Sequence, residues 1–183
     1  MNQELLEIVN ETTILGLIIS NDLTWKKNTE YLVQKANKRM IIIRNLIQFP
    51  IPRKDLVLIY CQYIRVILES NCVVWFASIT DEESEDLDRI QKNACKLILG
   101  TEYTHYENAL EKLGLEHLKE RRHKLAKKFA KGCLKIDEMK DLFPKSNESE
   151  YNLRENEKYD VKFASTARLF NSAVPTLQRM LNK

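Results

Sequence analysis

Apolar positions recur along the chain with two different periods, and the period changes near Thr24. Before that point the apolar runs at residues 5–9 and 14–19 are short, and the polar residues 20–22 close the second run. Short apolar runs bounded by turn-forming residues are typical of strands, so we predict a β-hairpin here. A glycine inside a strand favours a bulge or a close approach of another backbone, which we expect at Gly16.

This hairpin cannot be stable alone, because two strands do not hold themselves together in water. It is therefore expected to be the edge of a sheet that this sequence lacks. Its apolar residues Ile14, Leu17 and Ile19 would then have no surface to pack on. Strand edges exposed in this way favour self-association, which we expect through the hairpin.

From Thr24 onward the apolar residues recur every three or four positions, which predicts a succession of helices. The first covers about residues 24–49 and stops at Pro50. The second begins at Pro52, runs to about Phe76 and is apolar nearly all round, as is typical of the central helix of a bundle. Later helices are predicted over residues 80–100, 104–114 and 116–134, with a short final one from about Pro175.

Several of these helices carry recognisable end signals. Thr80 and Glu83 have capping-box spacing, Gly100 stands at the expected C′ position of the helix that they open, and Thr104 with Glu107 repeats the capping-box spacing. In the helix over 116–134, one stripe is expected to face the core. That stripe consists of Leu118, Leu125, Phe129 and Cys133.

The predicted fold class is therefore mainly α: a helical bundle with a short N-terminal β-hairpin and a partly irregular C-terminal tail. The polar residues 144–160 are expected to form a loop or to be partly disordered. The expected divisions are a hairpin over 1–23, a bundle over 24–100, a helical extension over 101–143, and a loop-rich tail over 144–183.

Composition agrees with this fold class and removes several function classes. The 183 residues are 44% hydrophobic, which is enough to bury a core, and the four Gly and four Pro exclude a collagenous or turn-rich all-β chain. Neither glycine-rich phosphate-binding motif, GxGxxG or GxxxxGK[ST], occurs. The first residues are acidic, unlike a secretory signal, and no apolar run reaches the ~18 residues of a membrane span. We expect no membrane partner.

The four cysteines indicate a reducing compartment. Cys61, Cys72, Cys95 and Cys133 contain no CxxC pair, and no histidine stands at zinc-finger spacing from them. All four fall within apolar helical patterns, so we expect buried, reduced thiols. The expected location is intracellular, either cytoplasmic or nuclear.

No group of residues predicts catalysis, a metal site or a cofactor. His105, His117 and His123 are not spaced as nucleophile partners or metal ligands. Six acids between residues 80 and 93 resemble a metal site, but they stand at a helix N-terminus, where carboxylates offset the helix dipole. We expect them to serve that structural role.

Charge is more informative than the small net value of +3, because basic residues concentrate in two predicted helices. Residues 24–49 hold six basic residues against one acid, and residues 116–135 hold eight against two. Such helices either present ordinary solvated faces or follow the phosphates of a nucleic acid. The candidates for phosphate contact are Lys26, Lys27, Lys35, Lys38, Arg39 and Arg44 in the first helix, and Arg121, Arg122, Lys124, Lys127, Lys128 and Lys131 in the second.

An ordered set of short segments resembles the C-terminal part of non-LTR (LINE-like, jockey-related) retrotransposon reverse transcriptases. Residues 14–25 resemble that family's LGV-x-I-x-x-DL-x-W segment, residues 35–46 its KAN-x-x-x-x-x-L-R stretch, and residues 60–75 its Y-x-x-x-I-R-x-x-LE-x-x-x-x-VW segment. Further matches stand at residues 86–94, 106–115, 118–122, 139–144 and 171–175.

The resemblance implies a fold and a partner. The N-terminal hairpin would be a remnant of the palm, with Leu15, Gly16 and Leu17 as a primer-grip-like strand, and residues 24–100 would form a thumb. A thumb binds the template–primer duplex of RNA or DNA through its backbone. The fingers and most of the palm would be missing partners, together with the Mg²⁺ that the palm carboxylates hold.

The family's polymerase motif contains an Asp-Asp pair, and this sequence contains none. Two-metal nucleotidyl transfer requires such carboxylates, so the chain alone is not expected to be an enzyme. The alternative hypothesis is a non-catalytic helical protein-interaction module, derived from a decayed or domesticated retroelement, that binds other proteins through exposed apolar surface.

Overall fold

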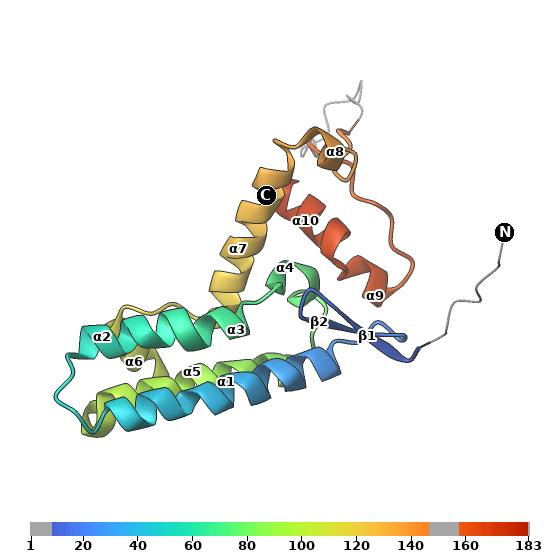
Figure 1. The fold of residues 1–183 in the computed structure, drawn as a ribbon. Helices are drawn as coiled ribbons and strands as arrows, with labels where there is room; N and C mark the ends of the chain where they lie inside the picture. Colours follow the sequence, from blue (N-terminus) through green and yellow to red (C-terminus); the bar gives the residue numbers. More distant parts are fainter. Residues whose placement is uncertain (1–8, 147–157, 183) are drawn as a thin grey trace.

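The computed structural model describes residues 9–146 and 158–182. Within them the chain is mainly helical and begins with a two-stranded antiparallel hairpin, which confirms the predicted fold class (Figure 1). Residues 5–8 of the first predicted strand, and residues 147–157 of the predicted irregular stretch, lie outside the described part. No helix among the described residues combines the length and the apolar character needed to cross a membrane.

The hairpin consists of β1 (Glu11–Ile14) and β2 (Leu17–Ser20), and its turn differs from the prediction. Ile14 pairs with Leu17, so Leu15 and Gly16 form a two-residue turn, with φ of 50° and 78°. A two-residue turn with positive φ at both positions is of type I′, and the twist of this turn type matches that of the paired strands. The single strand predicted over residues 14–19 and the bulge at Gly16 are therefore wrong, because the apolar run contains the turn.

The hairpin packs on the helices rather than on a missing sheet. Leu17 and Ser20 of β2 are buried, Ile19 packs against the main core, and the Ile18 N–H donates to Asn28 Oδ1 at 3.2 Å. The expectation that Leu17 and Ile19 lack a surface is wrong. All four residues of β1 are exposed, including Ile14 at 54%. Self-association through that strand stays a prediction.

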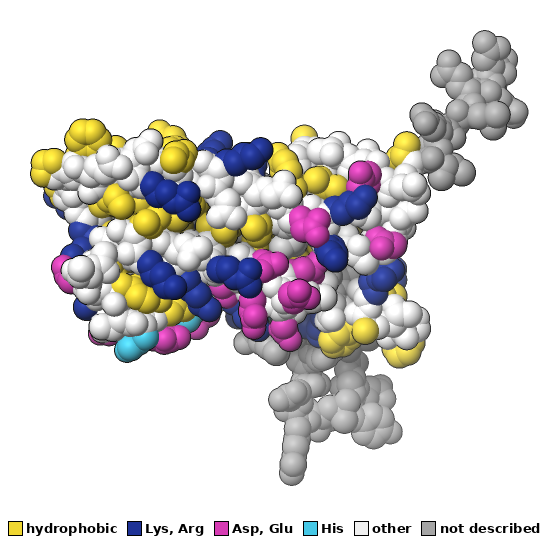
Figure 2. All heavy atoms as spheres, turned by 90° about the horizontal axis from the view of Figure 1, so that it is seen from below, with side chains coloured by type: hydrophobic (Ala, Val, Ile, Leu, Met, Phe, Trp, Pro, Cys, Tyr) yellow, Lys and Arg dark blue, Asp and Glu magenta, His cyan; other side chains and the backbone are white. Residues whose placement is uncertain are grey.

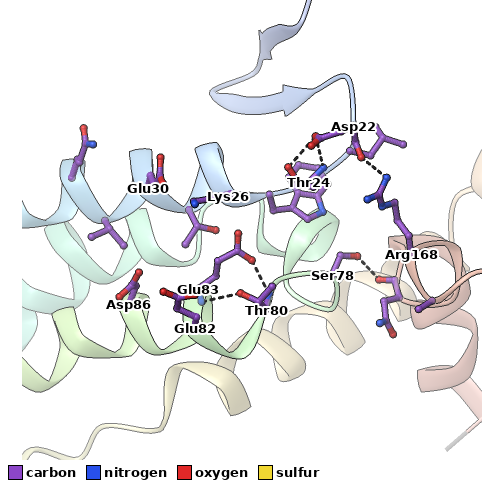
Figure 3. A pocket seen from close by; sticks show the side chains of 17 residues that line it. Asp22, Thr24, Lys26, Glu30, Ser78, Thr80, Glu82, Glu83, Asp86 and Arg168 are labelled. Atoms are coloured by element: carbon purple, nitrogen blue, oxygen red, sulfur yellow. Dashed lines mark hydrogen bonds between the residues drawn. The ribbon is translucent and has the colours of Figure 1, made fainter.

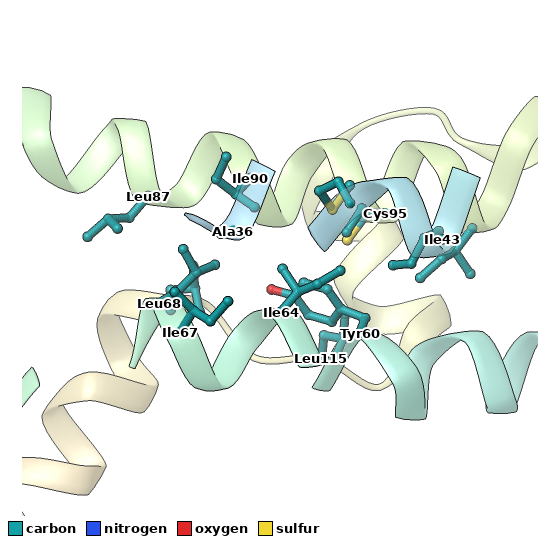
Figure 4. Packing of buried hydrophobic residues seen from close by; sticks show 14 of the residues in the cluster. Ala36, Ile43, Tyr60, Ile64, Ile67, Leu68, Leu87, Ile90, Cys95 and Leu115 are labelled. Atoms are coloured by element: carbon teal, nitrogen blue, oxygen red, sulfur yellow. The ribbon is translucent and has the colours of Figure 1, made fainter. Parts of the chain in front are cut away.

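Three long helical segments enclose the main core. They are α1 (Lys26–Leu46), α5 (Asp81–Leu99) and a rod built from α2 (Arg53–Ile59), a π-helical segment (Tyr60–Arg65) and α3 (Val66–Leu68). The predicted period of α1 is confirmed, since Ala36, Met40 and Ile43 are all buried. Figure 4 shows Ala36 and Ile43 between the residues of the rod and those of α5.

The rod is not the single helix predicted over residues 52–76. Its π-helical segment widens the backbone in the middle, and Asn71, with φ of 49°, interrupts it before α4 (Cys72–Trp75). Tyr60, at the start of the π-helical segment, is buried and donates to Gln91 Oε1 of α5 at 2.6 Å. A left-handed residue and a π-helical segment leave the apolar pattern almost unchanged, which is why that pattern alone predicts one helix.

The helix-end signals are confirmed with one exception. Thr80 and Glu83 form the predicted capping box at the start of α5, and Gly100 ends that helix with φ of 54°. The chain continues through the 3₁₀ turn Gly100–Glu102 into α6 (Tyr106–Leu113). The cap of α6 is His105 rather than Thr104, because the His105 Nδ1 accepts from the Asn108 N–H at 3.2 Å.

The last described helices build a second, smaller core beside the first. They are α7 (Leu118–Cys133), α8 (Asp137–Lys140), α9 (Ala167–Phe170) and α10 (Ala173–Asn182). Leu177 and Met180 of α10 share an apolar cluster with Ala126 and Ala130 of α7. In Figure 1, α7 rises away from the bundle, and α10 lies against α7.

The cysteines are all free thiols, and three of them are buried as predicted; Cys61 is half-buried. Burial raises the pKa of Cys72 and of Cys95 to about 11, so both stay protonated at neutral pH.

Candidate nucleic-acid interface

The face that α7 turns to the core differs from the predicted one. Leu118 and Cys133 are buried as expected, but Phe129 is 47% exposed and Leu125 only half-buried. Alanines and one arginine, which a hydrophobicity pattern does not count as core, complete the buried stripe instead. The buried residues of α7 are Leu118, Arg122, Ala126, Ala130 and Cys133.

Arg122 is therefore not a surface residue, and the prediction that it contacts phosphate is wrong. It is 1% exposed; its Nη2 donates to Ser84 Oγ at 3.2 Å and lies 3.7 Å from Asp88 Oδ1. Its guanidinium carbon lies 5.7 Å from the centre of the Trp75 ring. Burial lowers the pKa of Arg122, and the Asp88 carboxylate opposes that shift. This side chain fastens α7 to α4 and α5.

Arg121 is also engaged within the molecule. Its Nε and Nη2 donate to the two carboxylate oxygens of Glu69, at 2.5 and 3.1 Å. The fork geometry of such a bidentate pair makes it one of the stronger ion pairs in proteins. The hydrogen bond with Glu69 raises the pKa of Arg121. Arg121 therefore ties the start of α7 to the rod rather than facing an external ligand.

Five lysines follow one another along the outer face of α7 and the residues just after it. Lys124, Lys128, Lys131 and Lys135 are exposed, and Lys127 is half-buried. Positions three or four apart lie on one side of a helix, with Cβ atoms about 5–6 Å apart. Together they line a shallow groove of about 510 Å³ whose remaining lining residue is Gly132. We call Lys124, Lys127, Lys128, Lys131 and Lys135 the lysine ridge.

The lysine ridge is a concentration of cations with little compensation. Lys124 donates to Glu116 Oε1 at 2.6 Å, and this hydrogen bond lowers the pKa of Glu116. The other four lysines form no ion pair with any residue that the structure describes. No acidic residue occurs between Glu120 and Asp137. A row of uncompensated ammonium groups suits a polyanion.

Lys135 belongs to this ridge although it was not among the sequence candidates. Its position four residues after Lys131 was the available signal. It lies just beyond the last residue of α7, Cys133.

The basic residues of α1 are exposed, but several already have partners. Lys27 pairs with Glu11 of β1 at 2.5 Å, and Arg39 Nη1 donates to the Tyr63 carbonyl oxygen of the rod at 3.0 Å. Lys35 lies over the ring of Tyr31, with its Nζ 5.2 Å from the ring centre. Lys38 and Arg44 are exposed with no ion pair to a described residue.

The sixth basic residue of α1, Lys26, lines a cleft of about 920 Å³ in which acidic side chains outnumber basic ones by five to two. Figure 3 shows Lys26 and Glu30 coming from α1, and Glu82, Glu83 and Asp86 from α5. Seen from below the bundle, acidic side chains gather in one area while Lys and Arg side chains are dispersed (Figure 2). This end of α1 is therefore unfavourable for phosphate.

The two basic sets are not brought together. α1 packs mainly on α5, whereas α7 packs on α4 and α10 (Figure 1). The lysine ridge is consequently a surface separate from the basic residues of α1.

The primer-grip-like residues do not form one strand. Leu15 is 93% exposed at the tip of the hairpin, Gly16 completes the turn, and Leu17 is buried against the bundle. No group of three or more His, Cys, Asp or Glu side chains suited to a metal ion occurs among the residues described.

Comparison of the chain with protein-family models, with curated proteins and with solved structures finds no match.

Proposed function

We propose that this chain binds the sugar–phosphate backbone of nucleic acid through the lysine ridge, with little dependence on base sequence. The observation that carries this proposal is the four lysines of the ridge that form no ion pair with a described residue, three of them on α7 and the fourth just after it. Each phosphate that a lysine neutralises releases condensed counterions, which provides the free energy of binding. The ordered segments that resemble non-LTR reverse transcriptases support the same role, because a thumb contacts the template–primer backbone.

The test is a salt titration with a short DNA duplex and an RNA–DNA hybrid of the same sequence. With about four phosphate contacts, the plot of log affinity against log salt should have a slope of roughly −3 to −4. The variant in which Lys127, Lys128, Lys131 and Lys135 all become Gln should lose most of that slope. These side chains lie on the outer face of α7, so the variant should keep its fold.

The matched control changes Lys26, Lys27, Lys35 and Lys38 to Gln and so removes the same net charge from α1. Because Lys27 is paired with Glu11 and Lys26 faces carboxylates, we expect this variant to weaken binding less. An equal loss in both variants would mean that net charge, not the lysine ridge, determines binding, and would contradict the proposal.

A second candidate function, protein binding, is supported by a different surface. An apolar groove of about 400 Å³ lies at the base of the hairpin, and its lining includes Leu23, Trp25, Val74 and Leu169. Leu23 is 57% exposed and Val74 41%. The energy of such a contact comes from apolar burial, which moderate salt hardly screens. If the unmodified chain shows no salt-dependent binding of nucleic acid, that result favours this candidate.

A further inference from the structure

An apolar groove runs along α7 directly beside the lysine ridge. Its volume is about 500 Å³, within the range of ordinary ligand pockets. Three large apolar side chains on its wall are exposed: Phe129 at 47%, Ile136 at 45% and Met139 at 36%. The chain from Glu69 to Val73 closes the opposite side.

The groove and the lysine ridge lie next to each other on the surface of α7. Leu125 and Phe129 each stand one residue after a lysine of the ridge, which is a rotation of about 100° around the helix axis. Lys128 and Gly132 line both surfaces. Gly132 has no side chain, and the space where a Cβ would stand is open. A ligand can therefore extend from one surface to the other.

Phe129 lines the groove and is 47% exposed, so its ring is accessible to such a ligand. It makes no ring contact with another aromatic side chain or with a cation among the described residues. The one carboxylate of the groove, Glu69, is held by the Arg121 fork and so repels an anionic strand less than a free carboxylate would. The groove is apolar in its middle and cationic at its edge.

We propose that this groove takes an unpaired base of a nucleic-acid strand, stacked on Phe129, while the neighbouring phosphates lie on the lysine ridge. The inference rests on the proposed function and deepens it, because it selects a strand with unpaired bases over a blunt duplex. Bases within a duplex are already stacked and cannot enter a side groove without being unstacked. Aromatic side chains beside a basic surface bind single strands in a sequence-tolerant way.

The experiment compares Phe129→Ala with the unmodified chain on two single-stranded oligonucleotides of equal length. One is a natural strand, and the other is an abasic strand with the same number of phosphates. Phe129→Ala should weaken binding of the natural strand about tenfold and leave binding of the abasic strand unchanged. Phe129→Tyr keeps the ring face and should restore binding. Phe129→Leu keeps apolar bulk without the ring face and should not.

The outcomes separate this inference from the proposed function. If the four-lysine Gln variant and added salt change the binding of neither strand, the proposed function fails. If both strands depend on the lysine ridge but Phe129→Ala weakens them equally or not at all, the base site is overturned and backbone binding stands. A larger effect of Phe129→Ala on an acidic peptide with apolar residues than on the natural strand would also overturn the base site.

Discussion

Leu15 occupies a backbone conformation that suits glycine or asparagine. Its φ of 50° is in the left-handed region, where a Cβ costs about 1–2 kcal/mol, and its side chain is 93% exposed. The hydrogen bond that its carbonyl oxygen accepts from Asn71 Nδ2 belongs to the backbone and survives any side-chain change. The side chain of Leu15 therefore contributes little to packing while straining the turn.

We expect Leu15→Asn to raise the free energy of unfolding by about 0.5–1 kcal/mol, because Asn-Gly is the preferred type I′ turn sequence. Urea denaturation measures the difference. Leu15→Ala is the control: it removes the same exposed side chain but keeps the unfavourable conformation, and so it should give little gain. Equal stabilisation by both substitutions would show that the turn is not strained.

Arg122 and Asp88 are a charge pair below the surface, in which the Asp88 side chain keeps 21% exposure. Arg122→Leu leaves that carboxylate without its partner. We expect the free energy of unfolding at neutral pH to fall by about 2–3 kcal/mol, less than for a fully buried pair. Urea denaturation at pH 7 tests this, and an unchanged free energy of unfolding would contradict it.

The same variant should depend on pH in a definite direction. Burial raises the pKa of Asp88 above 3.8, and the Arg122 charge opposes this, so the pKa rises further in Arg122→Leu. A carboxyl whose pKa is raised by folding favours the folded state at low pH, and that benefit is lost as pH rises through the folded pKa. The deficit of Arg122→Leu should therefore shrink on acidification. Adding Asp88→Asn should abolish this trend, and a trend that persisted would implicate another group.

At the scale of elements, α5 shows what a sequence predicts well. Its apolar period, its capping box and its terminal Gly100 are all local signals, and all are confirmed. The Glu83 N–H donates to Thr80 Oγ1 at 3.2 Å, and the Thr80 N–H donates to Glu83 Oε2 at 2.7 Å. The box satisfies two backbone N–H donors that the helix start otherwise leaves to water.

Thr80→Ala should therefore lower the free energy of unfolding by about 1 kcal/mol. Thermal and urea denaturation measure the loss. Thr80→Ser retains the capping oxygen and should stay close to the unmodified chain. If the serine variant were as unstable as the alanine variant, the loss would come from the missing methyl group rather than from the cap.

The rod and α7 show where the sequence is insufficient. The π-helical segment from Tyr60 to Arg65 depends on contacts with distant residues, such as Tyr60 with Gln91 and Tyr63 with Arg39. No local pattern contains them. In α7 the apolar pattern predicts the wrong core stripe, because Arg122 is buried against Ser84, Asp88 and Trp75, which are remote in sequence.

The candidate site was predictable to the extent that it depends on spacing along one helix. Lys124, Lys127, Lys128 and Lys131 share a face because of the helical period alone. Which arginines beside them are available depends on the tertiary fold: Arg121 was lost to Glu69, whose place 52 residues earlier in the chain gives no local signal.

At the scale of the whole molecule, two apolar clusters share Val73 and Phe76 as packing neighbours. The larger contains residues from the hairpin through Leu118, and the smaller joins α7 to α10. The predicted divisions at residues 24 and 101 fall inside the larger cluster.

We expect the purified chain to show no primer extension on a primed RNA template with magnesium or manganese. The reason is chemical: two-metal nucleotidyl transfer requires closely placed carboxylates, and the sequence has no Asp-Asp pair. A radiolabelled or fluorescent primer assay measures this, with an active reverse transcriptase as the positive control. Extension that persisted through repeated purification would contradict the expectation.

The three helices α4, α7 and α10 pack on one another in pairs and form a triangle in Figure 1. Because each of these helices contacts the other two, α7 cannot change its angle to α4 unless its contacts with α10 also change. The packing of α10 therefore sets the direction in which the lysines of α7 point, although α10 supplies none of these lysines. If α10 came loose, α7 could change its orientation relative to the bundle. Its lysines would then no longer face one fixed direction, although all of them would still be present.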